Sequence, residues 1–285
     1  RLMARRSPPL LRAGTALPEE RAPDPDAWPD PTGERESAPF PFLLRKHRDR
    51  VLLLASAECH FHCRFCFRRG APLSPLTPGK LEAVCGWLAR EPEVEEVILS
   101  GGDPLTLSNE ALSALLTRLG GIEHVKRLRI HTRAPVTAPG RVDARLAETL
   151  RNAGKPVRVV IHPVHPDEFR PALFAALRRL RRSCAGLSSQ AVLLRGVNDS
   201  PETLFRLFAV LADAGVPARY LHHPDRAPGN RSFRLSLREG ASLYRELLRL
   251  AKTAGRAEAI PPYVLDLPNG AGKAPVTSLV PVGER

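Results

Sequence analysis

The stretch that decides the fold is Val51 to Cys66, VLLLASAECHFHCRFC. Its first five residues form a short apolar run that is typical of a buried strand. Three cysteines follow at once, Cys59, Cys63 and Cys66, inside the segment CHFHCRFCFRR. Three thiolates within eight residues can hold one corner of a cuboidal iron–sulfur cluster, and a missing fourth cysteine leaves one iron open. The spacing is also compatible with zinc, with His60 or His62 as fourth ligand.

Downstream of this stretch, short strand-like runs alternate with longer amphipathic stretches. The expected strands cover 51–55, 96–99, 127–131, 157–161, 190–194 and 218–222. The expected helices cover 78–90, 108–119, 141–153, 167–182, 201–214 and 236–254. Ser200 followed by Pro201 is a start signal for the fifth of these helices. Strands separated by helices pair in parallel through right-handed crossovers, so the rhythm predicts an α/β fold with a partial (βα)6 barrel.

Polar and chemically unusual segments follow each expected strand. The carboxyl ends of barrel strands share one rim, where active sites are built, so these segments predict one site. They are 59–66, 100–104, 131–133, 162–168, 195–199 and 222–225.

Composition excludes several classes of protein. The 285 residues contain no apolar run near the ~18 that a membrane helix needs, so we expect no membrane partner. No signal peptide opens the chain, which favours a cytoplasmic location, although the chain begins at Arg1 and its true start is open. Five cysteines are too few for a disulfide scaffold. The net charge of +13 fits a nucleic-acid partner, a pocket for anionic cofactors or a generally basic proteome.

The chain divides into three expected parts. Residues 1–44 are an arm that is extended or poorly ordered, because the first 41 residues hold nine of the 29 prolines and little periodicity. Residues 45–235 form the barrel, and residues 236–285 form a last helix and a glycine-rich segment.

The cysteine motif resembles that of the radical SAM superfamily. The segments ILSGGDPL (98–105), RLRIHTRAPV (127–136), HPVHPDEF (162–169) and QAVLLRGVND (190–199) narrow the resemblance to the lysine 2,3-aminomutase family. It implies a [4Fe–4S] cluster on the three cysteines, with S-adenosylmethionine (SAM) at the open iron. The residues that it places near SAM are Ser100, Gly101, Gly102, Asp103, His162 and Gln190. Glycines after a strand also let backbone groups approach a ligand closely, although the strip could be an ordinary turn and the histidines satisfied rim residues.

The segment from Asp266 to Pro275, DLPNGAGKAP, resembles the part of this family that holds pyridoxal 5′-phosphate (PLP). By resemblance, Lys273 is the catalytic lysine that binds PLP covalently. The resemblance also places Lys46, His47 and Arg50 at the PLP phosphate. The family commonly has arginine and tyrosine where this chain has Lys46 and His47, and both replacements still donate hydrogen bonds. A flexible surface turn is the other interpretation of the glycine-rich segment.

The resemblance also implies the substrate and the reaction. Arg68 matches the arginine that pairs with the substrate carboxylate, and Asp225 and Asp266 match the two acids that hold the distal ammonium of lysine. We therefore expect a 2,3-aminomutase that converts L-lysine to β-lysine, supplied with electrons by a flavodoxin or ferredoxin type of donor. One alternative is an aminomutase that makes β-lysine for elongation factor P modification. Another class is a zinc-containing nucleic-acid binding module, although the motifs disfavour a nucleic-acid partner.

Overall fold

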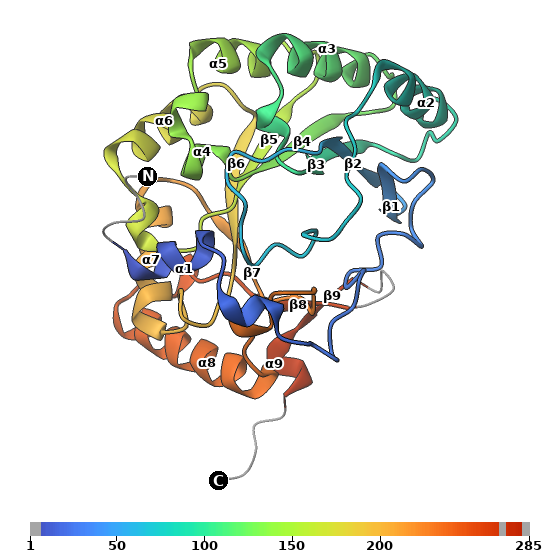
Figure 1. The fold of residues 1–285 in the computed structure, drawn as a ribbon. Coiled ribbons are helices and arrows are strands. Elements are labelled where there is room, and N and C mark those ends of the chain that lie inside the picture. The colour runs from blue at the N-terminus through green and yellow to red at the C-terminus, as the bar shows by residue number, and fades with distance from the viewer. Residues whose placement is uncertain (1–6, 268–271, 281–285) are drawn as a thin grey trace.

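A single curved sheet organises the molecule, and seven of its strands run parallel (Figure 1). The computed structural model describes residues 7–267 and 272–280. Within them the strand order follows the chain order, and the two edge strands are antiparallel to their neighbours. The strands are β1 (Leu43–His47), β2 (Arg50–Ser56), β3 (Glu96–Gly101), β4 (Arg127–Thr132), β5 (Val157–Ile161), β6 (Gly186–Val192), β7 (Ala218–His222), β8 (Tyr263–Asp266) and β9 (Lys273–Pro275).

The helices cover the outside of the curved sheet (Figure 1). Six strand–helix units run from β2 to α8, and β8 follows them, so the predicted partial (βα)6 barrel is confirmed. None of the described helices combines the length and apolar character that crossing a bilayer requires. The helices are α1 (Pro8–Gly14), α2 (Pro78–Leu88), α3 (Asn109–Gly120), α4 (Ala134–Thr137), α5 (Ala144–Arg151), α6 (Pro171–Arg181), α7 (Pro201–Asp213), α8 (Leu237–Thr253) and α9 (Val276–Leu279).

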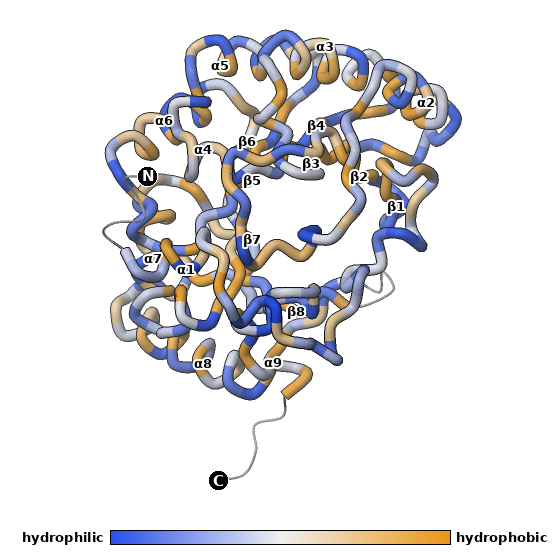
Figure 2. Tube along the Cα trace, in the orientation of Figure 1, coloured by the Kyte–Doolittle hydropathy of each residue, from blue (hydrophilic) through white to orange (hydrophobic). Residues whose placement is uncertain are grey.

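The core lies between the sheet and the helices. In α3 the buried leucines stand at positions 112, 115, 116 and 119, which is one face of a helix. Figure 2 shows the same alternation of apolar and polar residues along the outer helices. On β4 the buried residues alternate with His131 and other polar residues, which therefore face the inside of the barrel.

The fifth predicted strand was misplaced. We expected it at 190–194, whereas β6 covers Gly186–Val192. Leu193 and Leu194 are fully buried but lie after the strand. Burial, not strand structure, explains their apolar character.

The N-terminal arm, defined here as residues 7–42, has more regular structure than the extended or poorly ordered arm that we expected for residues 1–44. It contains α1 and a single 3-10 turn (Pro18–Arg21), and it runs from the α7 side of the barrel to β1 (Figure 1). Ala13 is fully buried in a small apolar cluster with Leu194 and Phe233. Arg12 donates to the carbonyls of Arg195 and Ser232 at 3.2 and 3.0 Å. Side-chain hydrogen bonds to the barrel thus fix a segment that has little hydrophobic periodicity.

The start of α7 provides a test of the fold. The Ser200 hydroxyl accepts a hydrogen bond from the Thr203 amide at 3.2 Å, as the sequence predicted. Ser200→Ala should lower the free energy of unfolding by about 1 kcal/mol, because one helix amide loses its partner. Ser200→Asp should retain most of it. Urea titration measures both, and equal midpoints for the alanine variant and the parent would contradict the cap.

Candidate functional site

The three cysteines lie on the loop between β2 and α2, the cysteine loop (residues 57–77). The end of β3 holds the start of this loop. The amides of Gly102 and Asp103 donate to the carbonyls of Ser56 and Glu58 at 2.7 and 2.6 Å. A Cβ on Gly102 would lie 2.2 Å from the Glu58 oxygen, so only glycine fits. The glycine strip predicted to approach SAM thus approaches the protein's own backbone.

The surroundings of the three cysteine thiols favour their protonated form. Burial raises the pKa of Cys59 to about 12 and of Cys63 to about 11, and it also raises the pKa of Cys66. Metal binding must therefore displace their protons. Within the described residues, no three His, Cys, Asp or Glu side chains converge tightly enough for one ion. A cuboidal cluster binds each thiolate at a different iron, so it does not need such convergence.

Asp103 has a structural use that the sequence did not reveal. Its carboxylate accepts hydrogen bonds from the Leu105 amide, the Thr132 hydroxyl and the amides of Arg133 and Ala134, all between 2.7 and 3.0 Å. The residue is buried. With its oxygens committed in this way, Asp103 joins the end of β3 to the end of β4 and positions the strip beside the cysteines.

Arg133 is a buried cation beside the cysteine loop that sequence reasoning did not single out. Its guanidinium lies over the rings of Phe61 and Phe65, at 5.4 and 5.3 Å from their centroids. Glu168 accepts one hydrogen bond from it at 2.7 Å, and two of its nitrogens have no partner among the described residues. The aromatic residues between the cysteines gave the only sequence signal for such a contact.

The predicted SAM residues on later strands have different surroundings. His162 follows β5, inside the barrel, and its ring packs edge-on against His131 at 5.3 Å. Burial lowers the pKa of His162 to about 3 and that of His131 well below its usual value, so both are neutral at pH 7. Gln190 lies on β6 and is half-buried. His165 instead caps a turn by accepting the Asp167 amide at 3.2 Å, which is the satisfied rim histidine of the alternative interpretation.

Lys273 lies at the first position of β9, opposite Asp266 on β8. Its ammonium forms an ion pair with that carboxylate and lies 5.8 Å from the centroid of the Tyr220 ring. The tip of the β1–β2 hairpin supplies the predicted phosphate-binding residues. Burial, then Arg50 and more weakly Lys273, lower the pKa of His47. The basic hairpin and Lys273 come from opposite ends of the sheet order.

Lys46 and Arg50 already have partners within the protein. The Lys46 ammonium donates to the carbonyl of Thr32, and burial lowers its pKa. Arg50 forms two 2.9 Å hydrogen bonds with its neighbour Asp49. That carboxylate is partly exposed. A phosphate at this position would therefore share the two cations with these groups.

The two predicted ammonium-binding acids are close enough to affect each other. Burial and then the charge of Asp266 raise the pKa of Asp225 to about 7. Burial alone would raise the pKa of Asp266 too, but His222, 2.9 Å away, and Lys273 hold it below its usual range. The Asp225 carboxylate makes no hydrogen bond or ion pair with any residue that the structure describes. Asp225 is therefore the acid that lacks a cation.

Arg68 lies almost completely buried beside these groups, and its partner is a residue that the sequence analysis missed. Glu34, from the N-terminal arm, accepts hydrogen bonds from Nε and Nη2 of Arg68. Nη1 donates to the Ser100 hydroxyl at 2.9 Å. The arm has no periodicity and Glu34 is 34 residues from Arg68, so no local pattern could reveal the pair.

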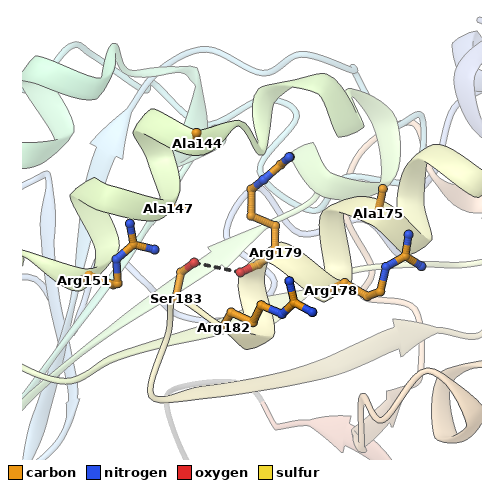
Figure 3. A pocket seen from close by; sticks show the side chains of 8 residues that line it. All are labelled: Ala144, Ala147, Arg151, Ala175, Arg178, Arg179, Arg182 and Ser183. Atoms are coloured by element: carbon orange, nitrogen blue, oxygen red, sulfur yellow. Dashed lines mark hydrogen bonds between the residues drawn. The ribbon is translucent and has the colours of Figure 1, made fainter.

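The barrel also has a basic groove on its outer layer, between α5 and α6 (Figure 3). Its lining includes four arginines and two alanines of α5: Arg151, Arg178, Arg179, Arg182, Ala144 and Ala147. The hydroxyl of Ser183 donates to the Arg179 carbonyl at 2.7 Å. Part of the net charge of +13 is therefore on the outer helices, as expected for arginines spread along solvated faces.

Comparisons with known proteins agree with this geometry. The family model described as the Radical SAM superfamily matches residues 54–221. An L-lysine 2,3-aminomutase of Escherichia coli (strain K12) is 39% identical over 244 residues, which cover 85% of this chain and 71% of the relative. A putative L-lysine 2,3-aminomutase of Treponema pallidum is 38% identical over 277 residues, covering 95% and 76%.

Two solved structures share the fold at low identity. Streptococcus suis SuiB bound to precursor peptide SuiA has a TM-score of 0.57 and 16% identity, over 78% of this chain and 49% of that one. Native anSMEcpe with bound AdoMet and Kp18Cys peptide has a TM-score of 0.54 and 11% identity, over 73% and 61%. From the barrel, the cysteine loop and these matches together, we conclude that the chain belongs to the lysine 2,3-aminomutase family of the radical SAM superfamily.

Proposed function

We propose that this radical SAM enzyme is a PLP-dependent aminomutase that moves the α-amino group of L-lysine to C3. One observation carries the proposal. Lys273, the carboxylates of Asp225 and Asp266 and the guanidinium of Arg68 belong to one electrostatic cluster. That cluster holds a lysine for PLP, a cation for a carboxylate and acids for an ammonium. A zinc-containing nucleic-acid module has no use for this set.

The residues fit the cofactors. Membership of the superfamily implies a [4Fe–4S] cluster and SAM, and Cys59, Cys63 and Cys66 would hold the cluster. Lys273 would hold PLP, with the phosphate at Lys46, His47 and Arg50. When bound, these groups supply an adenosyl radical and a conjugated ring that stabilises the migrating centre. An electron donor of flavodoxin or ferredoxin type would start the reaction.

The protein's own part is to position the two ends of the substrate. Arg68 binds the carboxylate, because a planar fork matches its two oxygens. Asp225 and Asp266 bind the distal ammonium, which relieves the repulsion between them. His131 and His162 stay neutral and add no competing cation. Anaerobic reconstitution and product analysis over lysine, glutamate, arginine and alanine test the proposal, and β-lysine from lysine alone is the expected result.

The first prediction concerns the cluster. Cys63→Ala should lose the broad charge-transfer absorbance and SAM cleavage, because one iron loses its thiolate. Cys184→Ala is the matched control: its thiol is half-buried and donates to the Gly186 carbonyl at 3.3 Å, so it should retain both. Iron and sulfide analysis with absorbance spectra measures the outcome. A full iron content and normal turnover in Cys63→Ala would show that the cysteine loop does not hold the cluster.

The second prediction concerns Lys273. Borohydride reduction of the PLP-loaded enzyme should fix a pyridoxyl group onto the peptide that contains Lys273. Lys273→Ala should lose this label and the 2,3-shift and keep SAM cleavage, since the cysteines lie on a separate loop. Lys252→Ala, an exposed lysine on α8, should behave like the parent. Peptide mass spectrometry locates the label. A label on another lysine would show that the glycine-rich segment is only a surface turn.

The third prediction uses the titration of Asp225. Its pKa of about 7 means that the carboxylate is protonated below pH 7, and binding of an ammonium must expel that proton. The Kd for lysine should therefore rise as the pH falls below 7, by up to about tenfold per unit for one proton. Calorimetry between pH 5.5 and 8.5 measures this profile.

Asp225→Asn should weaken lysine binding above pH 7, where the parent carboxylate is ionised, and flatten the profile. Removing one partner of a desolvated charge pair costs about 2–5 kcal/mol, which is roughly 30-fold or more. The cluster absorbance and the PLP label should persist in this variant. If the Kd of Asp225→Asn for lysine equalled that of the parent at every pH, Asp225 would not bind the ammonium.

A further inference from the structure

Hydrogen bonds within the arm and from β1 hold the turn that carries Glu34. The two oxygens of Asp30 accept the amides of Glu34 and Arg35, each at 2.8 Å. Gly33 has a φ of 65°, the left-handed conformation that favours glycine. Lys46 donates to the carbonyl of Thr32 in the same turn. Hydrogen bonds and the glycine conformation therefore fix the position of Glu34.

Glu34 occupies only one edge of the Arg68 guanidinium. An arginine has five N–H donors. Glu34 takes Nε–H and one Nη2–H, and Nη1 faces the Ser100 hydroxyl at 2.9 Å and the Gly101 carbonyl at 3.5 Å. The last contact is too long to be a strong hydrogen bond. The outer edge, made of Nη1 and Nη2, keeps donors for a second carboxylate.

Space is available beside the pair. A cavity of about 350 Å³ has both Glu34 and Arg68 in its lining, and most of the other lining residues are apolar, among them Pro31, Phe67 and Leu73. The Arg68 guanidinium also lies 4.8 Å from the centroid of the Phe67 ring. In such surroundings a guanidinium with no anion is costly to bury. Glu34 supplies that anion before any substrate arrives.

We propose that Glu34 is a positioning residue for substrate binding: it fixes the plane of Arg68 so that the outer edge of the guanidinium chelates the α-carboxylate of the amino acid. The inference rests on the proposed function, since it assumes an amino acid substrate. It makes the N-terminal arm part of the substrate site. Removal of the Glu34 charge leaves Arg68 free to turn toward other acceptors, and carboxylate binding loses its preset geometry.

The test compares lysine with lysinamide, which lacks the carboxylate. Glu34→Gln should raise both the Kd and the KM for lysine by about tenfold or more, because a charged partner of a buried arginine is lost. The kcat should stay within about threefold, and the Kd for lysinamide should not change. Glu34→Asp should recover part of the lysine affinity. Calorimetry on the reconstituted enzyme and steady-state kinetics provide these values.

Asp24→Asn is the matched control. Asp24 also belongs to the arm and forms a buried ion pair with a barrel arginine, Arg234, which is not part of the cysteine loop. It should lower the thermal midpoint and leave the discrimination between lysine and lysinamide unchanged. If Glu34→Gln weakened the binding of lysine and of lysinamide equally, Glu34 would only attach the arm to the cysteine loop. Tighter lysine binding would show that Glu34 competes with the carboxylate, and either result overturns the proposal.

A failure of the proposed function has a different signature. If the parent binds another amino acid in place of lysine, the lysine proposal fails for the parent and for every variant alike. The acid and the amide of that amino acid then replace the lysine pair in the comparison. The Glu34 proposal predicts that Glu34→Gln weakens the binding of this amino acid and leaves the binding of its amide unchanged. Equal effects on both overturn the proposal.

Discussion

The close approach of two backbone segments, Ser56–Glu58 and Gly101–Asp103, is the constraint on which the site depends. Amide–carbonyl hydrogen bonds of 2.6–2.7 Å join them, and the space between them excludes any Cβ. Asp103 then extends the connection to β4. The cysteine loop is thus attached to the adjacent strand before it turns across the mouth. Gly101 to Asp103, which the sequence suggested for ligand binding, thus also hold the cysteine loop.

Ion pairs between the arm and the cysteine loop add a second level of order. Three arginines of this loop pair with two glutamates of the arm: Arg64 and Arg69 with Glu20, and Arg68 with Glu34. The backbone contributes as well, since the amide of Arg64 donates to the carbonyl of Ala13 at 2.9 Å. These charges are partly or fully buried, so removing one partner leaves the other uncompensated. The arm therefore adds to the contacts by which β3 holds the loop that carries the cysteines.

Sequence reasoning succeeded where the signal was local. Strand and helix periodicity, the Ser200 cap and the polar segments after the strands predicted the barrel and its rim. It failed where an interaction joins distant segments. Glu34 lies in a proline-rich arm, and the His222–Asp266 contact spans 44 residues. The start of β6 was missed because Leu193 and Leu194 are buried without belonging to the strand. An apolar residue indicates burial, and residues that follow a strand can be buried as well as the residues within it.

The docking of the arm has a consequence for the order of events during synthesis. The arm leaves the ribosome before the barrel, and its partners follow much later: Ser7 pairs with Asp167, Asp24 with Arg234, and Arg12 with the carbonyl of Ser232, at separations of 160, 210 and 220 residues. Domains fold as units as the chain emerges. The arm can therefore complete these contacts with the barrel only when nearly the whole barrel exists. Until then only its ion pairs with the cysteine loop, at separations of 34 to 49 residues, can hold the arm in place.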